Sequence, residues 1–190
     1  MARLLHLNGP PGIGKSTLAR RYAAEHPGVL NCDIDVLRTL IGGWSDDFAA
    51  AGGLIRPAAL AFISAYLAEG HDVVLPQMLA RVGELERFEA AATGVGAEFV
   101  TVMLTDEEAS VVARFHARGA GGADEVDPWH EQVRRIVAEE GGDGVLTHYH
   151  RRLGEVLAAR PDALEVASLD GDGDVDATYR AVLTAVGAEA

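Results

Sequence analysis

The sequence predicts an α/β fold in which a parallel sheet is covered by helices on both faces. Five short and nearly continuous apolar segments alternate with stretches of helical periodicity. Apolar strands of this kind are typical of parallel sheets that are buried on both sides. A glycine-rich turn separates the first apolar segment from the first helical stretch. We find no internal repeat and no linker, so we expect a single domain over residues 1–190.

The elements follow from local patterns along the chain. The predicted strands, recognised by their short apolar runs, are residues 3–8, 28–33, 72–77, 97–104 and 163–168. A helix is expected over residues 57–69, because it starts with a proline in its first turn and stops at Gly70. Two further stretches have an apolar helix face: Leu85, Phe88 and Ala92 in one, and Val111, Val112 and Phe115 in the other.

Composition and charge narrow the class of protein. The chain is 48% apolar with ordinary charge content, which indicates a soluble globular protein. Its net charge of −13 argues against general binding of nucleic acid or anionic membranes, so we expect neither DNA nor a membrane as a partner. The single cysteine, Cys32, excludes an intrachain disulfide. With no signal peptide and with an apolar segment from Pro57 too short to span a bilayer, we expect a cytoplasmic protein.

The stretch LNGPPGIGKSTLARRY contains Lys15, which is the only lysine among the 16 lysines and arginines of the chain. Gly9, Gly14, Lys15 and Ser16 fit the pattern G-x-x-x-x-G-K-[ST], after an apolar strand and before a helix. Such glycines let backbone N–H groups converge on one phosphate, and the helix start adds its dipole. Lys15 supplies a compact charge for the β- and γ-phosphates, where the planar fork of arginine would not fit.

We therefore predict a phosphate-binding loop for ATP, with the Ser16 hydroxyl as a ligand of Mg²⁺. The residues of this loop are Gly9, Pro10, Pro11, Gly12, Ile13, Gly14, Lys15, Ser16 and Thr17.

Two other classes of nucleotide-binding protein fit less well. A conventional GTPase carries an N-K-x-D motif, which cannot exist in a chain whose only lysine is Lys15. A large ATPase needs an apolar strand that ends in Asp-Glu, and FVTVMLTDEE resembles one. Thr105 and Glu108, however, have the spacing of a capping box that opens the next helix. We favour the capping interpretation.

Two carboxylates, Asp33 and Asp35, follow the second predicted strand in NCDIDVLR. If the strand continues through them, residues two apart point to the same side. The carboxyl ends of parallel strands gather around the site that the first β–α loop opens. One carboxylate could hold Mg²⁺, and the other could accept a proton from an attacking hydroxyl. Alternatively, one aspartate caps a helix that starts near Val36, and Asp35 is well placed for that.

Arg114 and Arg118 lie on one face of a helix that precedes a glycine-rich stretch, and we expect a lid around residues 114–135. The two arginines could neutralise the charge of a phosphoryl group in transfer, or form a solvated pair near the helix end. Trp44 and Phe48 either line an acceptor pocket or anchor a loop. Four further arginines are interpreted as solvated or lid-flanking: Arg134, Arg135, Arg151 and Arg152.

Over most of its length the chain resembles small P-loop kinases of the chloramphenicol phosphotransferase type, which are related to zeta-toxin-like, gluconate-kinase-like and shikimate-kinase-like enzymes. The similar stretches are LNG before the phosphate loop, IDVLR, and RFHARG. The resemblance implies a three-layer P-loop sandwich with a five-stranded parallel sheet of order 2-3-1-4-5 and a helical lid. It also implies that Asp35 is the catalytic base and that Arg114 and Arg118 are lid arginines.

One position departs from that pattern. Several relatives have an acidic residue at the end of the third strand, where this chain has Gln77. An amide cannot supply a carboxylate to a metal. Support for Mg²⁺ is therefore expected from Ser16 and Asp33.

Together these features predict an ATP- and Mg²⁺-dependent phosphotransferase that moves the γ-phosphoryl group of ATP to a hydroxyl of a small-molecule acceptor. The catalytic residues would be Lys15, Asp35, Arg114 and Arg118. The alternatives are a nucleotide, nucleotide-sugar or RNA 5′-hydroxyl kinase, and a nucleotide-binding regulator or weak ATPase without an acceptor. The sequence indicates neither the acceptor nor the oligomeric state.

Overall fold

The computed structural model describes residues 1–117, 128–168 and 174–188 of the chain. Within these residues, five parallel strands form one sheet in the order β2-β3-β1-β4-β5. The strands are β1 (Arg3–Asn8), β2 (Leu30–Asn31), β3 (Val73–Pro76), β4 (Glu98–Thr105) and β5 (Leu164–Ala167). The fold class and the strand order expected from the resemblance are confirmed, although β2 is shorter than predicted.

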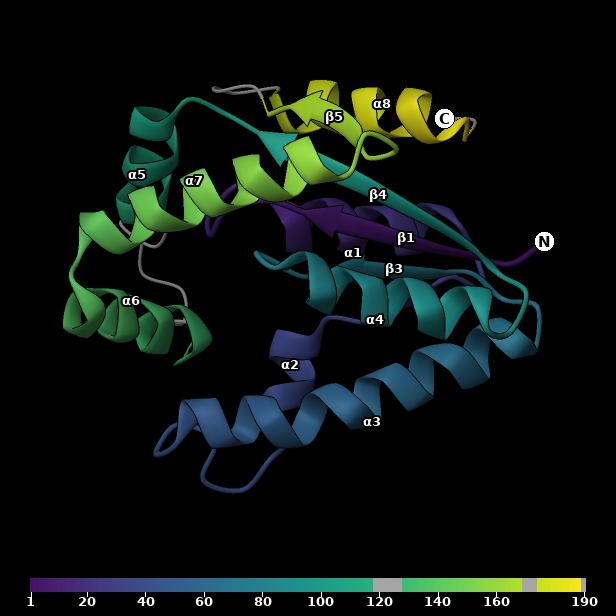
Figure 1. Cartoon of the computed structure of the whole chain (residues 1–190), viewed down its shortest axis with the longest axis horizontal. Coiled ribbons are helices and arrows are strands. Elements are labelled where there is room, and N and C mark those ends of the chain that lie inside the picture. The colour runs from purple at the N-terminus through teal and green to yellow at the C-terminus, as the bar shows by residue number, and fades with distance from the viewer. Residues whose placement is uncertain (118–127, 169–173, 189–190) are drawn as a thin grey trace.

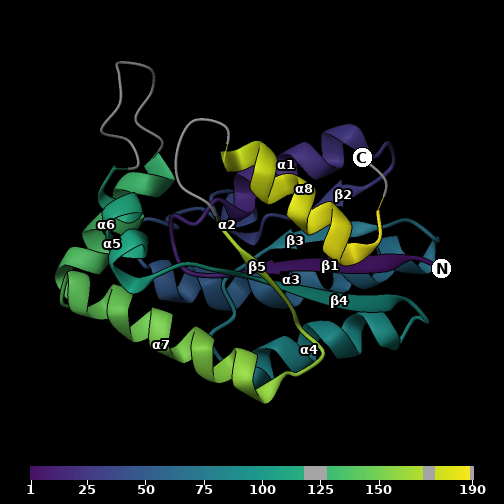
Figure 2. The same cartoon turned by 90° about the horizontal axis from the view of Figure 1, so that it is seen from above.

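Helices cover both faces of this sheet and give the molecule three layers. Figure 2 shows α1 and α8 above the sheet, and α4 and α7 below it. The helices are α1 (Lys15–Glu25), α2 (Ile34–Arg38), α3 (Phe48–Ala68), α4 (Val82–Thr93), α5 (Glu108–Ala117), α6 (Pro128–Glu140), α7 (Asp143–Ala159) and α8 (Asp174–Val186).

The central strand β1 explains why both layers are stable. Leu4 belongs to a buried cluster with α3 and α4, whereas Leu5 and Leu7 belong to a second cluster with α1 and α8. Successive residues of a strand point to opposite faces, so one apolar strand supplies both cores. Each fully buried leucine contributes roughly 1.5–3 kcal/mol to stability.

Helix α3 differs from the prediction, because it begins at Phe48 and not at Pro57. The Asp47 side chain caps it by accepting a hydrogen bond from the N–H of Ala50 at 2.9 Å. Pro57 lies inside the helix, where the missing N–H of proline removes one helical hydrogen bond. Packing outweighs this loss, since Ile55 and Ile63 of α3 lie in the core.

Helix α3 includes and extends the apolar segment from Pro57, which the sequence analysis judged too short to span a bilayer. Over its 21 residues, α3 is long and apolar enough to cross a membrane by length and composition alone. The same helix packs against α2, α4 and β3.

The strands place the functional residues at one edge of the sheet. In Figure 1, β1 and β4 run from the side of the N-terminus toward α5 and α6. Because all five described strands are parallel, their carboxyl ends meet at this edge. The loop after β1 and the segment after β2 both begin here.

The predicted capping box at the end of β4 is wrong. Helix α5 begins at Glu108, too late for Thr105 to be its N-cap. The Thr105 hydroxyl donates instead to Glu165 at 3.1 Å, and the Glu108 carboxylate accepts from Thr147 at 3.0 Å.

Candidate active site

The loop between β1 and α1 has the conformation that the glycine pattern predicts. Gly9 has a φ of +145°, and a Cβ atom there would lie 2.8 Å from the carbonyl oxygen of Leu104, so no larger residue fits. Gly14 is the N-cap of α1 with a left-handed φ of 101°. Lys15 opens the helix, and its Nζ donates to the carbonyl oxygens of Gly9 at 2.7 Å and Pro10 at 2.8 Å. The ammonium group is thus held at the loop, beside the helix start, where a phosphate would bind.

Asn8, which the sequence analysis did not single out, anchors this loop to the segment that follows β3. Its side chain is fully buried; Oδ1 accepts from the N–H of Gly9 at 2.9 Å and of Leu79 at 3.0 Å. Its Nδ2 donates to the carbonyl oxygen of Leu79 at 3.0 Å. The loop and the segment after β3 are therefore fixed to each other by one amide.

A cavity of about 850 Å³ opens beside the loop. Its wall includes Lys15 and Ser16 from the loop and Asp33 and Asp35 from the segment after β2. A volume of this size is within the range of roughly 300–1,000 Å³ for small-molecule sites. The structure thus brings seven of the predicted site residues to one cavity, since Pro11, Gly12 and Gly14 of the loop also line it.

The two aspartates reach the cavity in a different way from the one predicted. Strand β2 ends at Asn31, so they do not lie on a continuing strand. Asp33 is the N-cap of α2, and its Oδ1 accepts from the N–H of Asp35 at 3.1 Å. The alternative that one aspartate caps this helix is therefore confirmed, but the cap is Asp33 and not Asp35, which lies in the first helical turn.

Burial first, and the charge of Asp33 second, raise the pKa of the Asp35 carboxyl from its ordinary 3.8 to about 6. A carboxyl group with a pKa near the working pH suits general base catalysis. The environment of Asp35 is therefore compatible with accepting a proton from a hydroxyl group.

The predicted Mg²⁺ ligands, Ser16 and Asp33, line the same cavity. The described residues contain no cluster of three or more histidine, cysteine, aspartate or glutamate side chains that could hold a metal alone. Mg²⁺ typically uses one or two protein ligands together with phosphate oxygens and water. The residues present fit an ion of this kind that arrives with a nucleotide.

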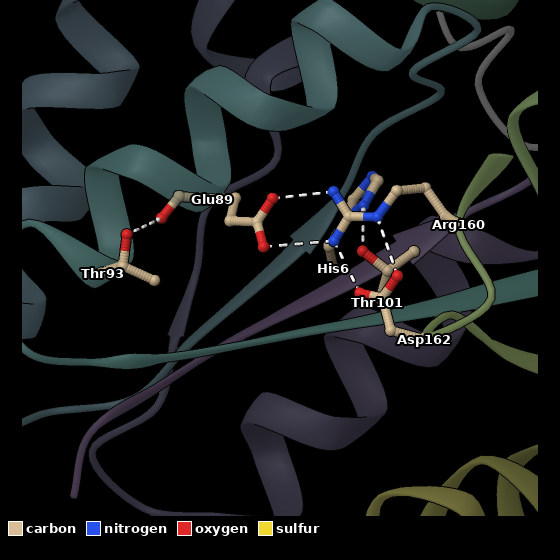
Figure 3. A network of polar contacts seen from close by, with 6 residues as sticks. All are labelled: His6, Glu89, Thr93, Thr101, Arg160 and Asp162. Carbon is tan, nitrogen blue, oxygen red and sulfur yellow. Dashed lines mark hydrogen bonds and ion pairs between the residues drawn. The ribbon is translucent and has the colours of Figure 1, made fainter.

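Gln77, the position that departs from the relatives, also lines the cavity and is only 6% exposed. Its backbone carbonyl oxygen accepts from Nε2 of His6 at 2.9 Å. His6 is fully buried beside Thr101, and burial lowers its pKa to about 4 (Figure 3). A neutral imidazole therefore supports the end of β3 from inside the sheet.

Arg38 is a site residue that the sequence analysis missed. It is 5% exposed, lines the cavity, and has its Cζ 4.0 Å from the ring centroid of Phe48 and 5.3 Å from that of Trp129. In the part of the chain that the structure describes, no hydrogen bond or ion pair reaches its guanidinium group. Burial lowers its pKa, and the charge of Asp35 opposes this shift.

Arg160 shows how a partly buried arginine is satisfied in the same protein. Its side chain is 12% exposed, and it forms ion pairs with Glu89 at 2.7 Å and Asp162 at 2.6 Å (Figure 3). The hydrogen bonds that its guanidinium group donates to both carboxylates, to Asp162 first, raise its pKa. By contrast, Arg38 is a buried cation with no such partner among the described residues, which is costly for folding alone.

Arg114, one of the two predicted lid arginines, lines a different cavity from that of Asp33 and Asp35. Arg114 donates to the Ser168 hydroxyl at 2.9 Å and forms an ion pair with Asp106 at 2.7 Å. It lines a separate, smaller cavity of about 150 Å³, together with Gly12 and Thr17 of the loop. Arg118 lies outside the described residues, so the catalytic role of both arginines stays a prediction.

The wall opposite the loop is aromatic. Trp44 and Phe48 line the cavity and also hold the segment between α2 and α3, so both alternatives for these residues apply. The far side comes from α6, which contributes Trp129 and Arg134. Of the predicted lid, residues 128–135 belong to α6, and residues 118–127 lie outside the described part.

Comparison with known proteins identifies the family of the chain. A family model described as an AAA domain matches residues 4–139. No curated protein matches the sequence.

Several solved structures share the fold. A tunicamycin resistance protein from Deinococcus radiodurans has a TM-score of 0.62 at 17% identity, covering 100% of this chain and 98% of that one. A gluconokinase from Sinorhizobium meliloti 1021 has a TM-score of 0.62 at 18% identity, covering 96% and 90%. A shikimate kinase from Bacteroides thetaiotaomicron has a TM-score of 0.58 at 15% identity, covering 98% of each chain.

Identities this low establish the fold and not the substrate. The family match covers more than half of the chain, and the neighbours have the fold of the group that the sequence resembles. The chain therefore belongs to the AAA domain family and has the fold of the small P-loop kinases.

Proposed function

We propose that the protein transfers the γ-phosphoryl group of ATP to a hydroxyl of a small molecule that also carries an anionic group. The family and the structural neighbours support nucleotide-dependent phosphotransfer in general. The observation that carries the finer proposal is the wall of one cavity. It combines Lys15 of the phosphate loop with Asp35, a candidate base, and with Arg38, a buried cation without a partner among the described residues.

The reaction assigned to this cavity is an in-line displacement. The acceptor oxygen forms a bond to the γ-phosphorus, the bond from that phosphorus to the β–γ bridging oxygen breaks, and ADP leaves. The hydroxyl proton passes to the carboxylate of Asp35. Lys15 neutralises charge on the phosphates, and Mg²⁺ bound at Ser16 and Asp33 would offset further charge on the β- and γ-oxygens.

The anionic group of the acceptor is inferred from Arg38. A guanidinium group offers five N–H donors in a planar fork that matches a carboxylate or a phosphate. Arg38 is on α2, one turn after Asp35, and both residues line the cavity. An anion held by Arg38 would fix the acceptor while its hydroxyl lies at Asp35, and such orientation is a large part of phosphoryl-transfer catalysis.

The test is a screen for ADP release with neutral and anionic hydroxyl compounds: nucleosides, sugars, sugar acids, sugar phosphates, antibiotics and 5′-hydroxyl oligonucleotides. We expect acceptor-dependent release with a small anionic compound. Arg38→Met should remove this dependence, because it keeps the length of the side chain but not the charge. Arg180→Met, at an exposed position of α8, is the matched control and should behave as wild type.

Slow ATP consumption that no compound accelerates would contradict the proposal and favour a nucleotide-binding regulator. Acceleration by a neutral compound that Arg38→Met leaves unchanged would keep the phosphotransferase but reject the anionic acceptor.

A further inference from the structure

Three aromatic side chains form one cluster beside Arg38, and two of them, Phe48 and Trp129, lie over its guanidinium group. Trp129 is in the first turn of α6, Trp44 precedes α3, and Phe48 is the first residue of α3. The ring of Trp129 lies 5.9 Å from that of Trp44, at an interplanar angle of 27°, and 5.2 Å from that of Phe48, at 35°. We call Trp44, Phe48 and Trp129 the aromatic roof. All three line the cavity of the candidate active site.

The roof is a main contact between α6 and the segment before α3. The polar contacts there are long, because the Ser45 carbonyl oxygen accepts from Gln132 and from Arg135 at 3.4 Å each. Hydrogen bonds of this length contribute little. The stacked rings therefore carry most of the attraction that holds α6 against the acceptor side of the cavity.

The roof also fixes the orientation of the guanidinium group. Phe48 and Trp129 lie over the Arg38 side chain, at 4.0 Å and 5.3 Å from its Cζ. Gly52 of α3 also approaches it closely, since a Cβ there would lie 3.0 Å from Nη2. A group confined in this way has few orientations left, so its donors keep one direction before a ligand arrives.

Resting on the function proposed above, we propose that Trp129 is a positioning residue of the acceptor subsite. Through the aromatic roof, Trp129 would hold Arg38 ready to bind a carboxylate or phosphate group of a small acceptor. The residue would thereby make the acceptor half of the cavity depend on a helix that is remote in sequence from the phosphate loop.

The physical basis is the interaction of a cation with the electron-rich face of an indole ring. This interaction is stronger when both groups are desolvated than when they are exposed to water. Loss of the ring should free Arg38 to adopt other conformers and admit water around it. Roughly tenfold weaker anion binding is expected, with no change at the nucleotide.

The test measures anion binding without any phosphoryl transfer. The ¹⁵N-labelled full chain, saturated with Mg²⁺ and a non-hydrolysable ATP analogue to fill the phosphate loop, is titrated by NMR with inorganic phosphate and, separately, with acetate. The chain has two tryptophans, so the indole N–H signals of the roof are assigned by Trp129→Phe. The Nε–H signal of Arg38 is assigned by Arg38→Lys.

In wild type, one of the two anions should shift the indole and Arg38 signals saturably. The tighter anion indicates which group the acceptor carries. Trp129→Phe should stay within roughly threefold of the wild-type affinity, because it keeps an aromatic ring. Trp129→Ala should bind the anion roughly tenfold more weakly and the ATP analogue as tightly as wild type, which also shows that the variant is folded.

Unchanged anion binding in Trp129→Ala would overturn the positioning role, as would equal losses of anion and nucleotide binding. Absence of any saturable shift in wild type would overturn the subsite itself. Anion binding does not depend on turnover. A failure of the proposed reaction, seen as no acceptor-dependent ADP release, can therefore be distinguished from a failure of this inference.

Discussion

A Cβ atom at Gly52 would lie 3.0 Å from Nη2 of Arg38, although the two residues belong to different helices. Glycine inside a helix lowers stability by roughly 0.5–1 kcal/mol relative to alanine. The close approach gives a physical reason for a glycine at this position of α3. The space at Gly52 is occupied by the guanidinium group of the site.

Gly52→Ala should therefore separate helix stability from acceptor binding. The new methyl group would displace the Arg38 side chain by a few tenths of an ångström, and KM for the acceptor should rise roughly fivefold, the equivalent of about 1 kcal/mol. Gly53→Ala is the matched control, because a Cβ at Gly53 meets nothing within 4 Å. It should stabilise the protein by roughly 0.5–1 kcal/mol in urea unfolding and leave KM unchanged. Equal KM values in the two variants would contradict the role of the contact.

Lys15 is expected to serve the nucleotide and not the core. Lys15→Ala should abolish tight MgATP binding in calorimetry while the thermal unfolding temperature stays close to wild type. Lys15→Arg should also fail, because the guanidinium fork does not fit where Nζ contacts two loop carbonyls. Wild-type affinity in both variants would show that the loop does not bind phosphate through this residue.

Asp35→Asn keeps the size of the side chain but cannot accept a proton. We expect phosphoryl transfer to fall about 10²–10⁴-fold, with MgATP affinity nearly unchanged. Asp33→Asn should act on the metal: asparagine caps a helix about as well as aspartate, so α2 should persist while the Mg²⁺ concentration for half-maximal rate rises. The roles would be reversed if Asp35→Asn were active with a verified acceptor and Asp33→Asn were not.

The rate of transfer should increase with pH around the pKa of Asp35, which is about 6, because the base must be ionised. The contribution of Asp35 to the stability of the fold changes with pH in the opposite direction. Between its ordinary value of 3.8 and about 6, the folded protein holds a proton that the unfolded chain has lost, so this contribution decreases as pH rises. Asp35→Asn has no carboxyl to titrate at this position, so it lacks this decrease in stability with rising pH. Its stability relative to wild type, measured by urea unfolding, should therefore grow from pH 4 to pH 6; a constant difference would contradict the raised pKa.

His6 should make the stability of the protein increase with pH, opposite to the effect of Asp35. Its pKa is lowered from 6.5 to about 4, so in this range the unfolded chain binds more protons and stability rises with pH. In the Asp35→Asn background this slope is no longer opposed by Asp35, and urea unfolding should show it between pH 4 and pH 6.5. Replacement of His6 by Gln in the same background should flatten it.

Arg160, which is partly buried, and Arg38, which is buried, should respond differently to replacement by methionine. Arg160→Met leaves Glu89 and Asp162 without their cation, and because both carboxylates are solvent-exposed it should destabilise the protein by roughly 0.2–1 kcal/mol for each pair. Arg38→Met removes a buried charge that has no ion-pair partner among the described residues, so stability should stay the same or increase. Unfolding curves of the two variants at pH 7.5 test the contrast. A large loss of stability in Arg38→Met would indicate that this residue is structural.

The sequence predicts well those structural features that depend on residues close together in the chain. The five strands are apolar runs, and their alternation with helices determines a parallel sheet. The phosphate loop is equally local, since the glycines, Lys15 and Ser16 act within one turn of backbone. Both were predicted with nearly the observed bounds, apart from the short β2.

What the sequence does not predict depends on contacts between distant segments. In sequence, Arg38 is an ordinary basic residue in the last turn of a short helix, and only the fold reveals that it is buried without an ion pair. Trp129 stacks on Trp44 through tertiary packing that no local pattern encodes. The start of α3 was misplaced because Pro57 is a helix-start signal that packing overrides.

The chain places its single lysine where a nucleotide is expected, and this makes the pocket chemically addressable. Amine-selective acylation has one lysine side chain to modify, and that ammonium group lies against the loop carbonyls of Gly9 and Pro10. A reagent that carries an activated acyl group on a nucleotide would be delivered to Lys15, and the mass of the modified peptide would report occupancy of the loop. Because the sequence has a single lysine, covalent labelling of Lys15 can be used to identify ligands that compete at the site.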